Sequence, residues 1–328
     1  MAGKIEVSKM HILSNVSHRF RITPYAREIM CYVGQQKVYE DAQTTLKKLK
    51  GLDICTKQIE NVCRHYGQLL ENAQQQAIEQ GGKDKKVVHR ERCYAMLDGG
   101  MVLTREEKWK EMKLARLFDA SQAVEINKDR GHIGSSTYVA HLGNHKAFLK
   151  KVEYHVDSMA DVVFIADGAP WIWKWVEANY PEAVQILDFY HAKEHLCKWA
   201  EIVIKDGREK QCWIDEQSLL LLNNKADSVM DNITRLKVYT PKARNQRRIL
   251  LEYYATHRNR MNYKTYRENN LMIGSGPIEA AHRHVIQQRM KLSGQRWTLK
   301  GAQQIANLRT AHKSNQWYKV VELINKAA

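Results

Sequence analysis

The sequence has 328 residues, of which 44% are hydrophobic, and its 52 lysines and arginines outnumber 36 acidic residues for a formal net charge of +16. That apolar fraction supports a folded core and excludes a mainly disordered chain, and the length suits one large domain or two smaller ones. No apolar run approaches the ~20 residues that cross a bilayer, which excludes a membrane-spanning class. The cationic excess favours a polyanionic partner, because each phosphate contact releases a condensed counterion.

The six cysteines are scattered along the chain, and none forms a C-x-x-C pair. The spacing therefore indicates neither a zinc ribbon nor a disulfide framework. No secretory signal is recognised, so we expect reduced thiols in a cytoplasmic protein.

In the N-terminal region, residues 1–80, the periodicity predicts one helix over residues 38–49 and a second helix with Thr56 as its N-cap. Two helices around a glycine turn, here Gly51, are typical of a helix-turn-helix, whose second helix enters the major groove. The polar side chains that would reach bases or phosphates are Lys57, Gln58, Asn61 and Arg64. The alternative is that the two helices simply pack together.

A polar, Gly- and Lys-rich stretch over residues 81–92 predicts a linker, after which the pattern changes. Strands are predicted over residues 93–103, 109–118, 135–142, 162–166 and 183–187, with helices over 146–159 and 171–180. Three strands, helix, strand, helix and strand is the order of a ribonuclease-H-like core, an α/β fold with a central mixed sheet. The run at 162–166 is apolar throughout, as in a strand buried on both faces.

Strand signals vanish over residues 191–270, which predicts a helical insertion in the core at 93–190. Gly276 and Pro277 then open one more helix, with a buried stripe expected from Ile278, Ala281, Val285 and Leu292. Residues 271–328 are strongly basic: from 280 onwards nine lysines and arginines stand against one acidic residue. This basic region is either a solvated face or a track for phosphates.

Three acidic residues lie where a sheet enzyme places them. Asp98 is within the first strand, Asp167 directly follows the buried strand at 162–166, and Glu279 is in the first turn of the Pro277 helix. Ligands of α/β sheets bind at the carboxyl ends of strands. Each acid alone is more often structural, since Asp before Gly favours a turn and an acid near a helix N-terminus complements its dipole.

Phosphodiester cleavage explains why such acids would be needed. Two Mg²⁺ ions roughly 4 Å apart activate the attacking oxygen and stabilise the leaving oxygen, and a hard cation prefers carboxylate ligands. We expect two Mg²⁺ or Mn²⁺ ions, bridged by Asp98 and held on either side by Asp167 and Glu279.

A competing motif is H-x-x-E-H, the inverted zinc-protease signature, which His191, Glu194 and His195 match. A five-residue pattern with two free positions arises often by chance, and a protease would need a third ligand downstream. The basic charge and the strand order disfavour this alternative.

The sequence resembles the DDE transposases of bacterial insertion sequences, specifically the ISKra type, which are distant relatives of the Mutator-like group. The matching segments are Leu97-Asp98-Gly99, Ile165-Ala166-Asp167-Gly168-Ala169, Leu187-Asp188-Phe189-Tyr190-His191-Ala192, Gly274-Ser275-Gly276-Pro277-Ile278-Glu279 and Arg289-Met290-Lys291-Leu292-Ser293-Gly294-Gln295-Arg296-Trp297. Relatives are often longer at the N-terminus, so the resemblance leaves open whether this copy is N-terminally shortened.

The resemblance implies that Asp98, Asp167 and Glu279 form the catalytic triad, with Asp188 and His191 at the edge of the active site. It also implies a DNA-binding role for the N-terminal helix pair. Beyond the catalytic Glu, the cations Arg289, Lys291 and Arg296 would hold the DNA backbone. The ring of Trp297 would stack on a base, unless it belongs to the core.

The implied function is metal-dependent cleavage at the ends of an insertion sequence followed by strand transfer into target DNA. The partners would be double-stranded DNA and at least a second copy of the chain, because two ends are joined, in a cytoplasmic, nucleoid-associated protein without a membrane role. The alternative is a catalytically silent DNA-binding regulator derived from a transposase. The end sequence, the target preference and the choice between cut-and-paste and copy-out stay open.

Overall fold

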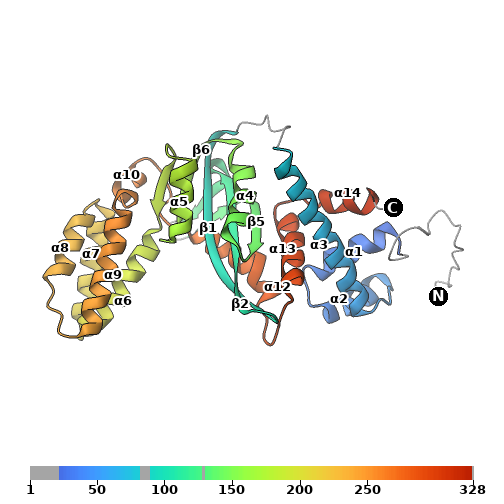
Figure 1. The fold of residues 1–328 in the computed structure, drawn as a ribbon, viewed down its shortest axis with the longest axis horizontal. Helices are drawn as coiled ribbons and strands as arrows, with labels where there is room; N and C mark the ends of the chain where they lie inside the picture. Colours follow the sequence, from blue (N-terminus) through green and yellow to red (C-terminus); the bar gives the residue numbers. More distant parts are fainter. Residues whose placement is uncertain (1–21, 82–88, 128–129, 327–328) are drawn as a thin grey trace, which may run out of the picture. The chain divides into compact units, whose positions relative to one another are not determined.

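A computed structural model describes residues 22–81, 89–127 and 130–326. The chain forms an α/β fold with a five-stranded mixed sheet in the order β5-β2-β1-β6-β7 (Figure 1). The strands are β1 (His89–Thr104), β2 (Lys108–Asp119), β5 (Thr137–Leu142), β6 (Met159–Ala166) and β7 (Val184–Leu187). β6 is parallel to both β1 and β7, whereas β2 and β5 pair with each other in antiparallel orientation. The predicted α/β class with a central mixed sheet is therefore confirmed.

β1 continues through Asp98, Gly99 and Gly100, as the strand predicted over residues 93–103 requires. One feature of the strands differs from the sequence prediction. A separate two-stranded sheet, β3 (Ala123–Asn127) and β4 (Arg130–Ile133), lies between β2 and β5 in the chain and was not predicted. Its strands are short and mix charged with apolar residues, so they lack the apolar run or clean alternation that identifies a strand.

The chain divides into two compact units. The first contains the described residues of 1–88 together with 99–158 and 280–326. The second contains residues 89–98 and 159–279. The predicted linker at 81–92 falls mostly on residues 82–88, which lie outside the described residues, and its last four residues belong to β1.

The first unit is built around α3 (Thr56–Glu79), which packs against helices from both ends of the chain. Its neighbours are α1 (Pro24–Gly34), α2 (Tyr39–Lys50), α4 (His145–Val156), α13 (Leu299–Lys313) and α14 (Tyr318–Lys326). The prediction of two helices around Gly51 agrees with α2 and α3. Thr56, however, is the first residue of α3 rather than its N-cap, which is Cys55 without a side-chain capping bond.

The second unit carries a block of helices that follows β7, as the sequence predicted. The helices α6 (Phe189–Val203), α7 (Gly207–Leu222), α8 (Ala226–Arg235) and α9 (Pro241–His257) pack in succession, and α9 returns to α6 (Figure 1). This unit also holds α5 (Pro170–Asn179), α10 (Tyr263–Glu268) and α11 (Gly276–Ala281). One-turn helices of the 3₁₀ type occur at Ala120–Gln122 (η1) and Arg258–Arg260 (η2).

Along the sequence, α11 is followed directly by a π-helical turn, η3 (His282–Gln287), and by α12 (Gln288–Met290). Ile278, Ala281 and Val285 are buried, as the predicted stripe required. Leu292 is exposed, so its place in the predicted buried stripe is wrong. The reason is that the helix ends at Met290, so the helical spacing does not extend to residue 292. No helix among the described residues has the length and apolarity needed to cross a membrane.

Candidate metal centre

Three aspartates occupy equivalent positions on three adjacent parallel strands of the second unit, Asp98 within β1 and the other two directly after the ends of β6 and β7. Leu97 of β1 pairs with Ala166 of β6, and Ala166 in turn pairs with Leu187 of β7. The residue that follows each of these three is an aspartate: Asp98, Asp167 and Asp188. Since residues at the same level of neighbouring strands share a face, the register sets the three aspartates in one row at this edge of the sheet.

Asp188 is the most constrained of the three. It is fully buried, and its Oδ1 accepts a hydrogen bond of 2.9 Å from the backbone N–H of His191, which caps α6. Its Oδ2 accepts a hydrogen bond from the backbone N–H of Ser275, the residue directly before α11. The next residue, Phe189, donates its N–H to the carbonyl of Ile273 at 2.9 Å. Asp188 thus ties the start of α6 to the segment that leads into α11.

This tie brings together side chains that are far apart in the sequence. The ligand atoms of Asp188, His191 and Glu279 all lie within 4.8 Å of one another. Asp188 is buried, His191 is half-buried and Glu279 is exposed, so the group opens from the sheet edge towards solvent. His191 lies in the first turn of α6 and Glu279 in the first turn of α11, which are the two segments that Asp188 anchors.

The donor set fits a divalent cation. Ligands on opposite sides of a Mg²⁺ or Mn²⁺ ion, each about 2.1 Å from it, stand about 4.2 Å apart, which is compatible with the 4.8 Å limit of this group. Carboxylate oxygens suit hard cations such as Mg²⁺ and Mn²⁺, whereas an imidazole nitrogen extends the choice towards Zn²⁺ and Fe²⁺. The group could therefore hold a metal ion.

The turn after β6 shapes the other side of the site. Asp167 Oδ1 accepts a hydrogen bond from the backbone N–H of Ala169 at 3.0 Å, and its carbonyl accepts one from Nε1 of Trp173 at 2.7 Å. The ring of Tyr253 fills the space beside Gly168, where an added Cβ would lie 2.1 Å from its Cε2. A glycine at this position is therefore required by the close approach of α9.

Tyr253 is held rigidly next to the carboxylates. Its ring packs against His195 and His257, with centroid distances of 4.4 and 4.9 Å. Burial raises the pKa of Tyr253, and the nearby charges of Asp167 and Asp188 raise it further, so the hydroxyl stays protonated. Among the described residues this buried hydroxyl has no hydrogen-bond partner. It is thus a donor available to a ligand or to water at the site.

The flanking histidines are neutral at neutral pH. Burial lowers the pKa of His257 to about 4, with a further contribution from the charge of Arg260. Burial also lowers the pKa of His195, with Lys198 acting in the same direction. His195 does not join the metal-capable group, although the H-x-x-E-H pattern pairs it with His191.

Of the predicted site residues, Glu279 lies close to Asp188 and His191, which the sequence analysis placed only at the edge of the active site. Asp98 and Asp167 follow Leu97 and Ala166, which pair across β1 and β6, but among the described residues neither belongs to the metal-capable group. The joint convergence of the predicted triad on two ions stays a prediction. Tyr253 was missed, because nothing in the sequence of α9 distinguishes it from the neighbouring Tyr254, which is also buried.

The predicted DNA-binding residues lie in the first unit, and several share a cavity of about 300 Å³. The residues of the predicted set that line it are Lys57, Arg64, Arg289, Arg296 and Trp297. Gln58 is half-buried, Asn61 and Lys291 are exposed, and none of these three is among the lining residues. Trp297 is only 8% exposed and donates its indole N–H to the carbonyl of Met290 at 3.1 Å, which favours the core alternative for this ring.

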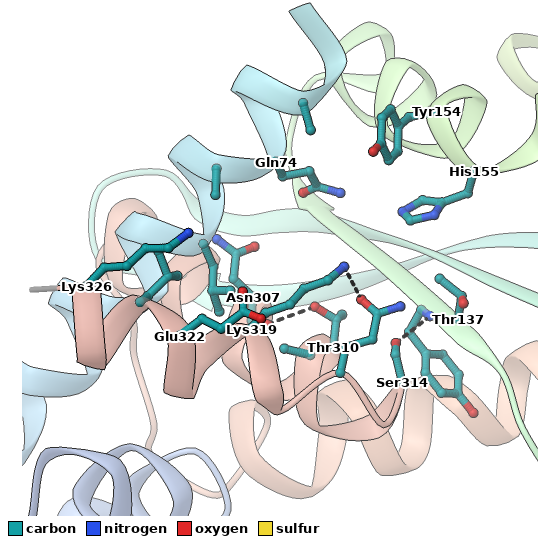
Figure 2. A pocket seen from close by; sticks show the side chains of 17 residues that line it. Gln74, Thr137, Tyr154, His155, Asn307, Thr310, Ser314, Lys319, Glu322 and Lys326 are labelled. Atoms are coloured by element: carbon teal, nitrogen blue, oxygen red, sulfur yellow. Dashed lines mark hydrogen bonds between the residues drawn. The ribbon is translucent and has the colours of Figure 1, made fainter. Parts of the chain in front are cut away.

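A second cavity of the first unit, of about 340 Å³, is lined by residues of α3, β5, α4, α13 and α14 (Figure 2). Some of its polar groups contact one another: Ser314 accepts a hydrogen bond from the N–H of Tyr138, and Lys319 donates to Gln316. The lining mixes apolar side chains with Lys319, Lys326 and Glu322 and gathers no cluster of carboxylates. The strand ends of the second unit are therefore the better candidate for catalysis.

Comparison with models of known protein families gives no match, and no curated protein matches the sequence.

Proposed function

We propose that this protein is a DDE-type transposase with a ribonuclease-H-like core, which cuts DNA at the ends of an insertion sequence and joins them to target DNA. The observation that carries the proposal is the meeting of Asp188, His191 and Glu279, because Asp188 follows β7 at the same level of the sheet at which Asp98 and Asp167 follow paired residues of β1 and β6. Support also comes from the net charge of +16, which suits a polyanionic substrate, and from the sequence resemblance.

Mg²⁺ or Mn²⁺, when bound, supplies Lewis-acid stabilisation of the charge that develops on the phosphate and lowers the pKa of an attacking water. The residues that would hold it are Glu279 with Asp98, Asp167 and the His191–Asp188 pair.

The protein's own groups contribute positioning and hydrogen bonding. Asp188 fixes the first turn of α6 and the approach to α11, so it sets the distance between His191 and Glu279. The protonated hydroxyl of Tyr253, without a partner among the described residues, can donate to a phosphate oxygen or to a water near Asp167. Because transposition joins two ends, the active assembly contains at least two copies of the chain.

The test is strand cleavage of DNA that carries the element's own ends, in Mg²⁺ and in Mn²⁺. Asp98→Asn, Asp167→Asn and Glu279→Gln should each abolish cleavage while DNA binding persists, because each removes a ligand charge and leaves the side-chain volume. Glu252→Gln is the matched control, since Glu252 is an exposed acid of α9 that pairs with Arg248. A wild-type protein that binds these ends without cutting them in either metal contradicts the proposal and supports the silent regulator.

A further inference from the structure

The cavity of the first unit contains an arginine whose charge is buried without a complete set of partners. Arg289 is 1% exposed, and only its Nε makes a hydrogen bond, of 3.1 Å, to the carbonyl of Gly34. Its two terminal nitrogens, Nη1 and Nη2, have no hydrogen-bond partner among the described residues, and the residue lines the cavity. A buried guanidinium with open donors is costly unless a ligand or water completes it.

Arg309 is a second buried arginine of the same unit, and its hydrogen bonds are typical of a purely structural role. Arg309 is 3% exposed, and its guanidinium donates to the backbone carbonyls of Val285, Gln35 and His284. All three of its nitrogens therefore have acceptors. The chain thus gives every nitrogen of one buried arginine a carbonyl acceptor, whereas it buries two nitrogens of Arg289, a residue that lines the cavity, without any acceptor among the described residues.

The guanidinium of Arg289 is held in a fixed plane. Its central carbon lies 5.0 Å from the ring centroid of Tyr39 and 5.0 Å from that of Trp297. The hydroxyl of Tyr39 is also buried without a hydrogen-bond partner among the described residues, and burial raises the pKa of Tyr39, so this hydroxyl remains a donor. Two residues that line one cavity therefore carry three unpartnered donor atoms, and aromatic packing fixes the orientation of the arginine.

The rim of the cavity is positively charged. Lys57, Arg64, Arg105 and Arg296 line it, and Glu60 is the one acidic lining residue. Glu60 is already paired with Lys57 at 2.8 Å and with Arg64 at 3.4 Å. Arg105 and Arg296 are exposed. The chain brings these groups together from α3, from the turn after β1 and from the segment after α12, so no single element forms the site.

From this geometry we infer that the cavity binds a phosphate group, with Arg289 and Tyr39 as its inner donors and the rim cations around it. A planar guanidinium with two free nitrogens matches the fork geometry of two phosphate oxygens. The cavity of about 300 Å³ exceeds the space of a single oxyanion, so the phosphate of a polynucleotide backbone with its adjoining sugar is the ligand that fits the volume and charge. The choice of DNA as the source rests on the proposed function.

The experiment compares two probes: a fluorescent duplex of the element's end, followed by anisotropy at several salt concentrations, and inorganic pyrophosphate, followed by calorimetry. Arg289→Met should weaken duplex binding by roughly tenfold or more, since a hydrogen bond to a charged group is lost. It should also reduce the slope of log affinity against log salt by about 0.9. Arg289→Lys should recover part of the affinity without the bidentate contact, and Arg248→Ala, which removes an exposed cation of α9, should change neither value.

Arg296→Ala and Arg105→Ala keep the inference testable if Arg289→Met fails to fold, because both side chains are exposed and line the rim. Each should weaken binding of the same probes. Loss of pyrophosphate binding in these variants, with duplex binding unchanged, assigns the pocket to a free phosphate and overturns DNA as the ligand. Unchanged binding of both probes in all pocket variants overturns the phosphate site itself. Cleavage by the Asp98→Asn protein tests the proposed function separately, because that variant leaves this cavity intact.

Discussion

The carboxylate of Glu279 lies within 4.8 Å of the ligand atom of Asp188, although the helices α6 to α10 separate the two residues in the sequence. The contact depends on a backbone hydrogen bond, because Asp188 accepts the N–H of Ser275 directly before the helix that carries Glu279. A buried carboxylate that organises two helix starts thus sits next to an exposed one that can bind a ligand. Within this group, Asp188 therefore positions the starts of α6 and α11, whereas Glu279 is free to bind a ligand.

Asp188→Asn tests the positioning role. Asparagine keeps one acceptor but turns an N–H₂ group towards a backbone N–H, either of His191 or of Ser275, so one buried donor loses its partner. We expect a loss of about 1–3 kcal/mol in the free energy of unfolding, measured by urea denaturation. Asp206→Asn is the matched control, because Asp206 caps α7 in an exposed position where asparagine is an equally good N-cap. Equal, small effects of both substitutions would contradict a special role for Asp188.

Metal binding tests the group itself. Titration calorimetry should detect Mn²⁺ binding to the wild-type protein, with Mg²⁺ binding more weakly because one ligand is an imidazole. His191→Ala and Glu279→Gln should each weaken Mn²⁺ binding by roughly tenfold or more, since even supporting residues of a metal site contribute this much. Glu252→Gln, outside the group, should leave the affinity unchanged. Wild-type affinity in both ligand variants would show that the metal binds elsewhere.

Gly168→Ala tests the close approach of α9 to the turn after β6. The new methyl group would lie 2.1 Å from Cε2 of Tyr253, whose ring is confined by His195 and His257 and cannot easily turn away. We expect a loss of about 1–3 kcal/mol in the free energy of unfolding from overpacking. Gly207→Ala, where an added Cβ meets nothing within 4 Å, should be neutral or slightly stabilising in the same denaturation experiment. A double substitution with Tyr253→Ala should recover part of the loss.

The free energy of unfolding of the second unit should decrease as the pH falls, because His257 is buried in its neutral form. Burial and the charge of Arg260 lower its folded pKa to about 4, whereas the unfolded value is about 6.5. Above pH 6.5 the residue is neutral in both states and contributes no pH dependence. As the pH falls from about 6.5 to 4, only the unfolded state takes up the proton, so stability decreases by on the order of 3 kcal/mol for this group.

Thermal unfolding between pH 4 and 7 measures this effect. His257→Gln should flatten the decrease, although it lowers the stability at pH 7 through lost packing. His132→Gln, which changes an exposed histidine of β4, should leave the pH profile as it is in the wild type. An unchanged slope in His257→Gln would assign the acid sensitivity to other groups.

Much of the α/β core could be predicted because its signals are local. The apolar run at residues 162–166 identifies β6, and the Gly-Pro pair at 276–277 identifies the start of α11. Asp167 and Glu279 could be selected because each directly follows or opens such an element. The β3–β4 hairpin was missed since its residues carry neither an apolar run nor regular alternation, and its pairing is defined only by hydrogen bonds between the strands.

The sequence by itself determined the classes of element, the basic charge and the acids at strand ends, because these depend on periodicity and on neighbours in the chain. Only the tertiary structure decided that Asp188 joins Glu279 at the centre of the metal-capable group, and that Tyr253 reaches Gly168. It also decided that Arg289, which lines a cavity, buries two nitrogens without acceptors among the described residues, whereas each nitrogen of Arg309 has a carbonyl acceptor. The physical reason is that burial and hydrogen-bond partners are set by segments distant in sequence, and no local pattern records which distant segment will supply them.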